Sequence, residues 1–405
     1  MISAITEITQ ISDEIENEVI GLRRRIHAYP ELSFQEFKTA ETVLEILKTL
    51  DVKVKTGIAG TGIIADMEGN GKGKSLLLRA DMDALPLQEF NQLPFKSSVE
   101  GVMHACGHDA HTANLLGVAM IMNRMRSKWS GRIRFVFQPA EERGGGGKKM
   151  IDEGILDDVS FDAALALHTS ATMSPGSIQV GWENITAYSD KFNIQVKGKK
   201  THSSNPSKGI DAINIAAHII VTLNSILAKN MDPMATGTFS IGIIRGGSAP
   251  NIVADEVMLE GMMRNVTPET RQIMIQKIES IAKHVAEGMG GQADFIFTEG
   301  YPSVYNNVEF TNFVYKQMTD YFEDWQSEIA LSDTLNPSQI IRQEKPLLGA
   351  EDFGFYSQRI PSCFYWVGTG NLAPAHSGDF MIEEKYIKLC LRSMATIAFE
   401  YLRFL

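Results

Sequence analysis

Residues 103–112 read Met-His-Ala-Cys-Gly-His-Asp-Ala-His-Thr, and an apolar helical run follows them directly. The stretch places three histidines, a cysteine and a carboxylate close together in the chain. Cys106 and His108 flank one glycine, so both side chains can face a common centre. A thiolate together with an imidazole favours a transition metal. Two ligands are too few to hold such an ion, so further ligands must come from elsewhere in the fold.

Three short apolar runs elsewhere in the chain each end abruptly in acidic residues or a histidine. The runs, with the residues that follow them, are Ser75–Ala80 before Asp81 and Asp83, Arg132–Phe137 before Glu141 and Glu142, and Ala163–Leu167 before His168. Such runs are typical of strands that are buried on both faces of a sheet. Ligands gather at the carboxyl edge of open α/β sheets. We therefore predict an α/β catalytic core in which these polar residues meet at one edge.

Helical spacing of apolar residues predicts the other elements of this core. The predicted helices lie at about 12–29, with Ser12 as the N-cap, at 35–50, at 109–126, and after 308 and 383. The helix at 109–126 would connect two of the predicted strands. This alternation of strands and helices is typical of α/β domains.

The sequence pattern changes from about Trp182. Strand and helix signals then follow in the order β-α-β-β-α-β, which is the order of a ferredoxin-like unit. The segments are strands at 191–197, 236–244, 252–264 and 293–297, with helices at about 209–227 and from Pro268. We predict a discontinuous catalytic domain at 1–182 and 300–405, interrupted by an inserted α+β domain at 183–299.

The composition argues against several classes of partner and compartment. A net charge of −11 argues against nucleic acid and anionic membranes as partners. The first residues lack the basic and apolar regions of a signal peptide, and no apolar run approaches membrane-spanning length. The three cysteines are widely spaced, so we expect no disulfide framework. We expect a cytoplasmic protein.

The candidate metal ligands are Cys106, His108, Glu142, His168 and His376. Thiolate, imidazole and carboxylate suit zinc, manganese, cobalt or nickel, and not calcium or magnesium. The set exceeds the needs of one tetrahedral zinc and suits two ions that share a ligand or a water. Glu141, beside one of the ligands, is then the predicted general base. Taken alone, His168 is typical of a core histidine and the glutamate pair of a solvated loop, but their places at separate strand ends favour the metal site.

Ordered motifs along nearly the whole chain resemble one family. They are Arg24-Arg-Ile-His-Ala-Tyr-Pro-Glu-Leu32, Arg79-Ala-Asp-Met-Asp-Ala-Leu-Pro86, His104–His111, Gln138–Glu142, His202-Ser-Ser-Asn-Pro206, Asn251–Asp255, Gly349-Ala-Glu-Asp-Phe353 and His376-Ser-Gly. On these residues the chain resembles the M20 metallopeptidase superfamily, in the amidohydrolase branch with aminoacylases, hippurate hydrolases and auxin-conjugate hydrolases. The resemblance implies a mixed-sheet α/β metallohydrolase domain with an inserted ferredoxin-like lid and dimerisation domain. It also implies two divalent transition-metal ions per subunit, and a homodimer or a dimer of dimers.

The resemblance further implies roles for individual residues. By motif position it assigns metal binding to the five candidate ligands and proton transfer to Glu141, and it makes Asp83 a carboxylate that orients a metal ligand. In the lid, His202 reaches an active site, in related dimers that of the partner, and stabilises the oxyanion. Asn251 and Arg264 hold the carboxylate of the substrate. For Arg264 a salt bridge within the lid is the alternative.

Two positions depart from the family pattern. After His168 the family usually has Trp-Pro or a similar pair, whereas this chain has Thr169-Ser-Ala. The last candidate ligand lies in Ala375-His-Ser-Gly instead of Leu-His-Ser-Pro. Both changes border the predicted pocket, so they bear on the identity of the substrate more than on metal binding.

These features predict a metal-dependent amidohydrolase that cleaves the amide bond of a small N-acyl amino acid, either N-acetyl or N-aroyl, with activated water and a glutamate base. The nearest alternative is a dipeptidase or carboxypeptidase that uses the same centre. The alternatives from other classes are a non-catalytic binding protein of this fold and a structural zinc domain.

Overall fold

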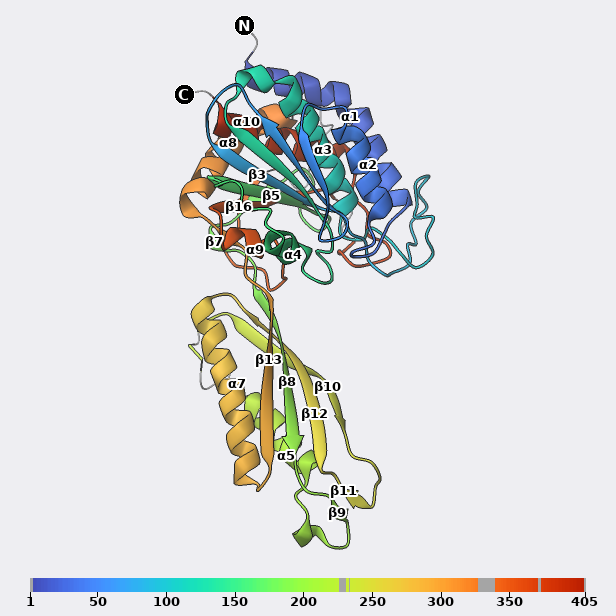
Figure 1. Cartoon of the computed structure of the whole chain (residues 1–405), viewed down its shortest axis with the longest axis vertical. Coiled ribbons are helices and arrows are strands. Elements are labelled where there is room, and N and C mark those ends of the chain that lie inside the picture. The colour runs from blue at the N-terminus through green and yellow to red at the C-terminus, as the bar shows by residue number, and fades with distance from the viewer. Residues whose placement is uncertain (1–2, 226–230, 233, 327–338, 371–372, 404–405) are drawn as a thin grey trace. The chain divides into compact units, whose positions relative to one another are not determined.

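The computed structural model describes residues 3–225, 231–232, 234–326, 339–370 and 373–403 (Figure 1). The chain forms two compact units. The first comprises Met1–Glu183, Val304–Glu344 and Asp352–Leu405, and the second comprises Asn184–Ser303 and Lys345–Glu351. No helix within the described ranges is both long and apolar enough to cross a membrane.

Among the described residues, eight strands form the large mixed sheet of the first unit, in the order β1-β2-β4-β3-β5-β16-β6-β15. Their bounds are β1 (Lys53–Ile58), β2 (Gly62–Glu68), β3 (Ser75–Asp81), β4 (Arg132–Gln138), β5 (Ala163–Ser170), β6 (Ile178–Val180), β15 (Ile340–Arg342) and β16 (Ser362–Gly368). A further short strand is β14 (Tyr305–Asn306), and the chain passes from the first unit to the second within β7 (Glu183–Asn184).

The strands that carry the predicted site residues run parallel. Strand β3 pairs in parallel with both β4 and β5, and β5 pairs in parallel with β16. The register places Asp81 opposite Gln138 and His168 opposite Trp366, all toward the carboxyl ends of these strands. The prediction that three strand ends meet at one edge of a sheet is therefore confirmed.

The long helices of the first unit pack on one another as well as on the sheet (Figure 1). Their bounds are α1 (Ala4–Ala28), α2 (Phe37–Leu47), α3 (His108–Arg124), α8 (Val308–Gln326) and α10 (Ile387–Leu402). Shorter helices are α4 (Gly146–Asp152) and α9 (Gly354–Ser357), with 3-10 turns at η1 (Arg126–Lys128) and η3 (Glu384–Tyr386). Every residue from His108 to Met122 is buried, because α3 contacts α1 and α10 as well as three strands of the sheet. Because α3 is buried on all sides, its apolar residues do not form a single stripe.

The start of α1 corrects one prediction. Ser12 is not an N-cap but a buried residue in the middle of the helix, where its hydroxyl accepts a hydrogen bond of 2.9 Å from Nε of Arg392. The N-cap is Ser3, whose side chain accepts from a backbone N–H of the first turn. The buried Ile5 and Ile8 continue the apolar spacing toward the N-terminus, and this spacing identifies the true start of the helix.

The second unit has the predicted ferredoxin-like topology. Its four-stranded antiparallel sheet has the order β10-β12-β8-β13, which is that of a β-α-β-β-α-β unit. The bounds are β8 (Tyr188–Lys197), β9 (Thr201–His202), η2 (Pro206–Lys208), α5 (Ala212–Leu223), β10 (Gly237–Gly246), β11 (Ile252–Val253), β12 (Glu256–Asn265), α7 (Pro268–Gly288) and β13 (Gln292–Tyr301). The predicted end of the first helix, Leu227, lies outside the described residues.

Candidate metal centre

The residues of the opening stretch lie at the carboxyl edge of the sheet. Gly107 has a φ of +90° and forms the N-cap of α3. A Cβ at this position would lie 2.3 Å from Oγ1 of Thr169, so only glycine fits here. The tight turn brings donor atoms of Cys106, His108 and His168 within 4.8 Å of one another. Sγ of Cys106 lies 3.4 Å from Nε2 of His168.

A second group of donor atoms shares the same cysteine. Cys106, Glu142 and His376 also lie within 4.8 Å of one another, and Nε2 of His376 is 3.1 Å from Oε1 of Glu142. His376 has a φ of +65°, a left-handed conformation that costs energy for a residue other than glycine. Its backbone N–H donates to the carbonyl of Ala105 over 2.8 Å. The structure thus brings all five predicted ligands together.

Hydrogen bonds leave the appropriate nitrogen of two histidines for a metal. Nδ1 of His108 faces two acceptors of Asp83, the carbonyl at 2.9 Å and Oδ1 at 3.3 Å, and therefore carries the proton. Nε2 of His108 is buried and has no hydrogen-bond partner among the described residues. In the same way, Nδ1 of His168 donates to the carbonyl of Thr169 over 2.6 Å, so its Nε2 carries the lone pair that faces Sγ of Cys106. Such outer contacts commonly fix the tautomer of metal-binding histidines.

His111 also lies close to these histidines, but both of its nitrogens are occupied. Nδ1 donates to Oδ1 of Asp81 over 2.7 Å, and Nε2 accepts from the backbone N–H of Thr169 over 2.9 Å. His111 therefore supports the strand that carries His168 and leaves no nitrogen for a metal.

Asp83 connects the candidate ligands to Glu141. Its Oδ1 accepts from the backbone N–H of Glu141, and its Oδ2 accepts from that of Glu142, each over 3.0 Å. Glu141 is 7% exposed, and one of its carboxylate oxygens lies within 4.8 Å of donor atoms of both His108 and Glu142. One buried carboxylate therefore orients a candidate ligand and fixes the turn that carries the candidate base.

The pKa shifts of the cluster show which protons a bound metal would have to displace. Burial raises the pKa of the Cys106 thiol to about 12 and lowers the pKa of His168 to about 3. Burial also opposes protonation of His108, but the charge of Asp81 and the hydrogen bond with Asp83 outweigh it and raise its pKa well above the usual value. A thiol with so high a pKa ionises at neutral pH only beside a cation, and a metal supplies that charge. Nε2 of His108 lies 3.7 Å from Oδ2 of Asp81 and has no hydrogen-bond partner among the described residues, so a metal would bind there by displacing the proton of the charged imidazole.

Sequence reasoning missed the buried residues behind the cluster. Arg79 donates from its two terminal nitrogens to Asp81 and to Asp352, each over 2.6 Å, and from Nε to Gln138 over 3.0 Å. Gln138 in turn donates to Asp352. An arginine inside an apolar strand is itself a signal, because a buried guanidinium requires acidic partners.

The three predicted residues of the second unit do not lie together. His202 pairs with Ile252 across β9 and β11. The backbone N–H of Ser203, the residue after His202, donates to the carbonyl of Asn251. Arg264 lies near the far end of β12, which begins at Glu256, so about 26 Å of strand separates the two places. One terminal nitrogen of Arg264 is buried without a hydrogen-bond partner among the described residues, and the nearby carboxylate of Asp190 pairs with Arg271 instead.

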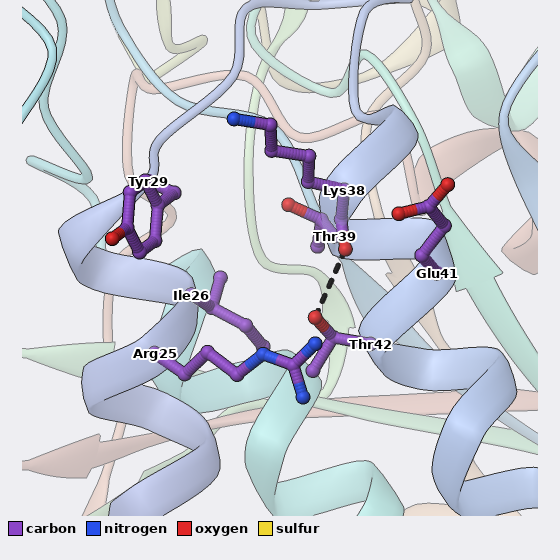
Figure 2. Close-up of a pocket in the computed structure, with 7 residues that line it drawn as sticks. All are labelled: Arg25, Ile26, Tyr29, Lys38, Thr39, Glu41 and Thr42. Carbon is purple, nitrogen blue, oxygen red and sulfur yellow. Dashed lines mark hydrogen bonds between the residues drawn. The ribbon is translucent and has the colours of Figure 1, made fainter.

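A separate surface pocket lies between α1 and α2 (Figure 2). It is lined by Arg25, Ile26, Tyr29, Lys38, Thr39, Glu41 and Thr42. Its arginine pairs with Glu45 over 2.5 Å, and its lysine lies 5.3 Å from the ring centroid of Tyr29. The pocket contains none of the predicted site residues.

An α/β sheet with cysteine, histidine and glutamate side chains gathered at its carboxyl edge, combined with an inserted ferredoxin-like unit, defines a class of two-domain metallohydrolases. The model of the peptidase family M20/M25/M40 matches residues 77–400, and the chain belongs to this family. It is therefore a hydrolase. The match confirms the resemblance inferred from the motifs.

Relatives of known name cover nearly the whole chain. The protein is 35% identical over 381 residues to an N-acetylcysteine deacetylase of Bacillus subtilis, and the alignment covers 94% of this chain and 96% of the relative. It is 36% identical over 397 residues to thermostable carboxypeptidase 1 of Saccharolobus solfataricus, with 96% of each covered. A solved structure of a dinuclear metal-binding peptidase of the M20 family from Bacillus subtilis matches with a TM-score of 0.82 and 32% identity, over 96% of this chain and 99% of that one. This structural match confirms the predicted fold class.

Proposed function

We propose that the protein hydrolyses the acyl amide of small N-acyl amino acids with two divalent transition-metal ions held by the cluster. The observation that carries this proposal is the pair of donor groups that share Cys106, with Glu141 immediately beside them. The relative named N-acetylcysteine deacetylase supports an acyl amide as the bond that is cleaved.

The two donor groups suggest how the ions would be held. Cys106, His108 and His168 would bind one ion, and Cys106, Glu142 and His376 would bind the other, so the thiolate of Cys106 belongs to both donor groups. Zinc, manganese, cobalt and nickel all accept this combination of sulfur, nitrogen and oxygen donors. Bound ions of this kind polarise an amide carbonyl and lower the pKa of water.

Glu141 is the proposed proton carrier. Its carboxylate accepts a proton from the attacking water and then delivers that proton to the leaving amine nitrogen. The backbone N–H groups of residues 141 and 142 donate to the carboxylate of Asp83, and these hydrogen bonds hold the base and the neighbouring ligand in a fixed relation. Burial of Glu141 excludes bulk water, which strengthens its interaction with the reacting groups.

The residues of the inserted unit are proposed to bind the substrate across a homodimer. His202 of the partner subunit would stabilise the oxyanion, with Asn251 beside it, and Arg264 would pair with the substrate carboxylate. Two features of Arg264 support this role: one nitrogen of its partly buried guanidinium has no hydrogen-bond partner among the described residues, and the nearby Asp190 pairs with Arg271 instead. The separation of Arg264 from His202 along β12 supports contributions from two subunits to one site.

Mixed dimers test this arrangement. Subunits with Glu141→Gln and subunits with His202→Ala are each expected to be inactive. After dissociation and mixing, half of the dimers hold one of each, and one of their two sites is intact, so about a quarter of wild-type activity should return. No recovery beyond the sum of the separate variants would show that His202 acts within its own subunit.

A substrate panel tests the function itself. Metal-free enzyme is restored separately with Zn²⁺, Mn²⁺ or Co²⁺ and assayed on matched N-acetyl amino acids, N-benzoyl amino acids and dipeptides. We expect kcat/KM to be highest for an N-acyl amino acid. The relative named as a carboxypeptidase makes peptide hydrolysis the second candidate. A dipeptide that exceeds every N-acyl amino acid in kcat/KM would favour that candidate instead.

The cysteines support a cytoplasmic location as part of the proposal. Cys106, Cys363 and Cys390 are all free thiols, and the last two are buried. Free thiols, one of them a proposed metal ligand, are compatible with a reducing compartment.

A further inference from the structure

Three successive backbone N–H groups at the turn after β4 all point at buried carboxylates. The N–H of Ala140 donates to Oε1 of Glu36 over 2.9 Å. Those of Glu141 and Glu142 donate to the two oxygens of Asp83. Glu36 is 104 residues away in sequence and lies at the start of α2. The turn that carries the proposed base and a proposed ligand is thus held by one carboxylate within the site and another outside it.

The oxygen of Glu36 that holds the turn also holds a second strained residue. Ala140 has a φ of +54° and Phe34 a φ of +65°, and the N–H groups of both donate to Oε1 of Glu36 over 2.9 Å. The other oxygen accepts the hydroxyl of Thr61 over 2.5 Å. Glu36 is fully buried, and this burial raises its pKa. A left-handed alanine persists only where its surroundings hold it.

Neighbours of Glu36 contact the same region. The ring of Phe34 packs on Gly144, where a Cβ would lie 2.5 Å from the ring, and Nζ of Lys149 lies 3.8 Å from the ring centroid. The hydroxyl of Ser33 donates to Oδ2 of Asp83 over 2.7 Å. Residues 33–36 therefore contact the loop after β4 on one side and the carboxylate of Asp83 on the other.

We propose that Glu36 is a positioning residue for the hydrolytic site, because it holds Ala140 left-handed and so sets the directions of Glu141 and Glu142. The inference rests on the proposed function of these two acids. Adjacent glutamates in an extended strand point to opposite faces of the sheet. The turn at Ala140 instead directs the backbone N–H groups of both glutamates to Asp83. The carboxylate of Glu141 is then placed as the base, and that of Glu142 faces His376.

The matched variants Glu36→Met and Glu36→Gln separate hydrogen bonding from volume. Methionine keeps much of the length of the side chain but cannot accept the bond from Ala140, whereas glutamine keeps an acceptor oxygen. We expect E36M to lower kcat about 100-fold, because small displacements of catalytic groups have effects of this size, while KM changes less than about threefold. E36Q should retain most of the activity.

A second substitution tests whether the turn is what Glu36 holds. Glycine adopts positive φ without the help of a neighbour, so Ala140→Gly in the E36M background should restore most of the lost kcat. Thr61→Val, which removes only the donor to the other oxygen, should give a smaller loss of the same kind. This variant also tests the proposal if E36M does not fold. As a control, Glu31→Ala removes a carboxylate that caps α2 through Lys38 and Thr39, and it should lower Tm without changing kcat.

A metal titration keeps this test independent of turnover. Calorimetry with Zn²⁺ on metal-free protein should show affinity reduced about tenfold in E36M for the ion that Glu142 would bind, and unchanged for the other. The proposal is overturned if E36M keeps wild-type kcat and metal affinity. It is also overturned if E36Q is as defective as E36M and Ala140→Gly does not restore the kcat of E36M. If the wild type hydrolyses no N-acyl amino acid or peptide, the proposed function fails, whereas the titration still decides the role of Glu36.

Discussion

At the scale of single residues, the site is defined by which nitrogen of each histidine is free. His108 and His168 donate from Nδ1 to backbone carbonyls, which leaves Nε2 for a metal, whereas His111 has both nitrogens engaged. The candidate ligands could be predicted from the sequence, because thiolate, imidazole and carboxylate groups select metals by their chemistry. The tautomers could not, since they depend on acceptors such as the carbonyl of Asp83, which the fold brings from 25 residues away.

Glu141 provides the prediction at this scale. Replacement by glutamine keeps the size of the side chain but removes its ability to accept a proton, so kcat should fall about 10²–10⁴-fold. Metal content, measured by mass spectrometry, should stay at the wild-type level. The exposed Glu100, changed to glutamine, is the matched control and should leave kcat unchanged. Wild-type turnover by a fully metal-loaded E141Q enzyme would contradict the role of the base.

At the scale of elements, the helix that carries His108 is fastened to α1 by a buried charge network. Oδ2 of Asp109 accepts from Nε of Arg23 over 2.7 Å and lies 2.8 Å from Nδ1 of His27, whose Nε2 is 3.3 Å from Glu89. Burial disfavours the charged form of His27, but the charge of Asp109 and the hydrogen bonds to both acids outweigh it and raise its pKa. His104 packs beside this histidine and has no hydrogen-bond partner among the described residues.

The network predicts a pH-dependent contribution to stability. Because the pKa of His27 is raised on folding, the stability that its charge contributes is fully present below about pH 6.5 and is lost as pH rises through the folded pKa. His27→Gln should therefore cost about 3 kcal/mol at pH 6 and less at pH 9. Urea unfolding of metal-free protein at both pH values measures this difference. The exposed His284, changed to glutamine, should give equal small effects at both, and a cost for H27Q that grows with pH would refute the assignment.

Elements also show where sequence reasoning succeeds and where it fails. Buried strands such as 75–80 and 163–167 were identifiable because they are apolar on both faces, and their polar successors marked the site. The start of α1 was misplaced because Ser12 has the residue type of an N-cap, although its partner Arg392 comes from the last helix. The bond from Ala140 to Glu36 joins residues 104 positions apart. No local pattern encodes a contact of this kind.

At the scale of the molecule, each of the two units has a core of its own. In the first, strands and helices bury a continuous set of apolar side chains, including Leu78, Phe135 and Leu165. In the second, two helices cover one sheet with residues such as Ile194 and Ile278. Of the candidate ligands, Cys106 packs against the first core, and the others are not among the apolar residues of either core. Because both cores are apolar, we expect the fold to form without a metal, unlike that of a zinc finger.

Metal removal tests this distinction. Chelation followed by dialysis should abolish hydrolysis while the far-UV circular dichroism at 25 °C stays close to that of the untreated protein, because the apolar cores remain buried. Addition of Zn²⁺, Mn²⁺ or Co²⁺ should restore the rate. Tm should fall in the metal-free protein, since ligands that bind only the folded state stabilise it. Collapse of the spectrum on chelation would instead support a structural metal.

The pairing of β5 with β16 has a consequence for how the protein is made. Ala164 lies opposite Ser362, and the whole second unit is encoded between them. At typical rates of synthesis, about 200 residues take roughly 10–40 s, and during that time one edge of β5 lacks its neighbour. An unpaired edge of a buried apolar strand is a template for aggregation. Translation speed and chaperone supply should therefore limit the yield of this protein during overexpression more than its final stability does.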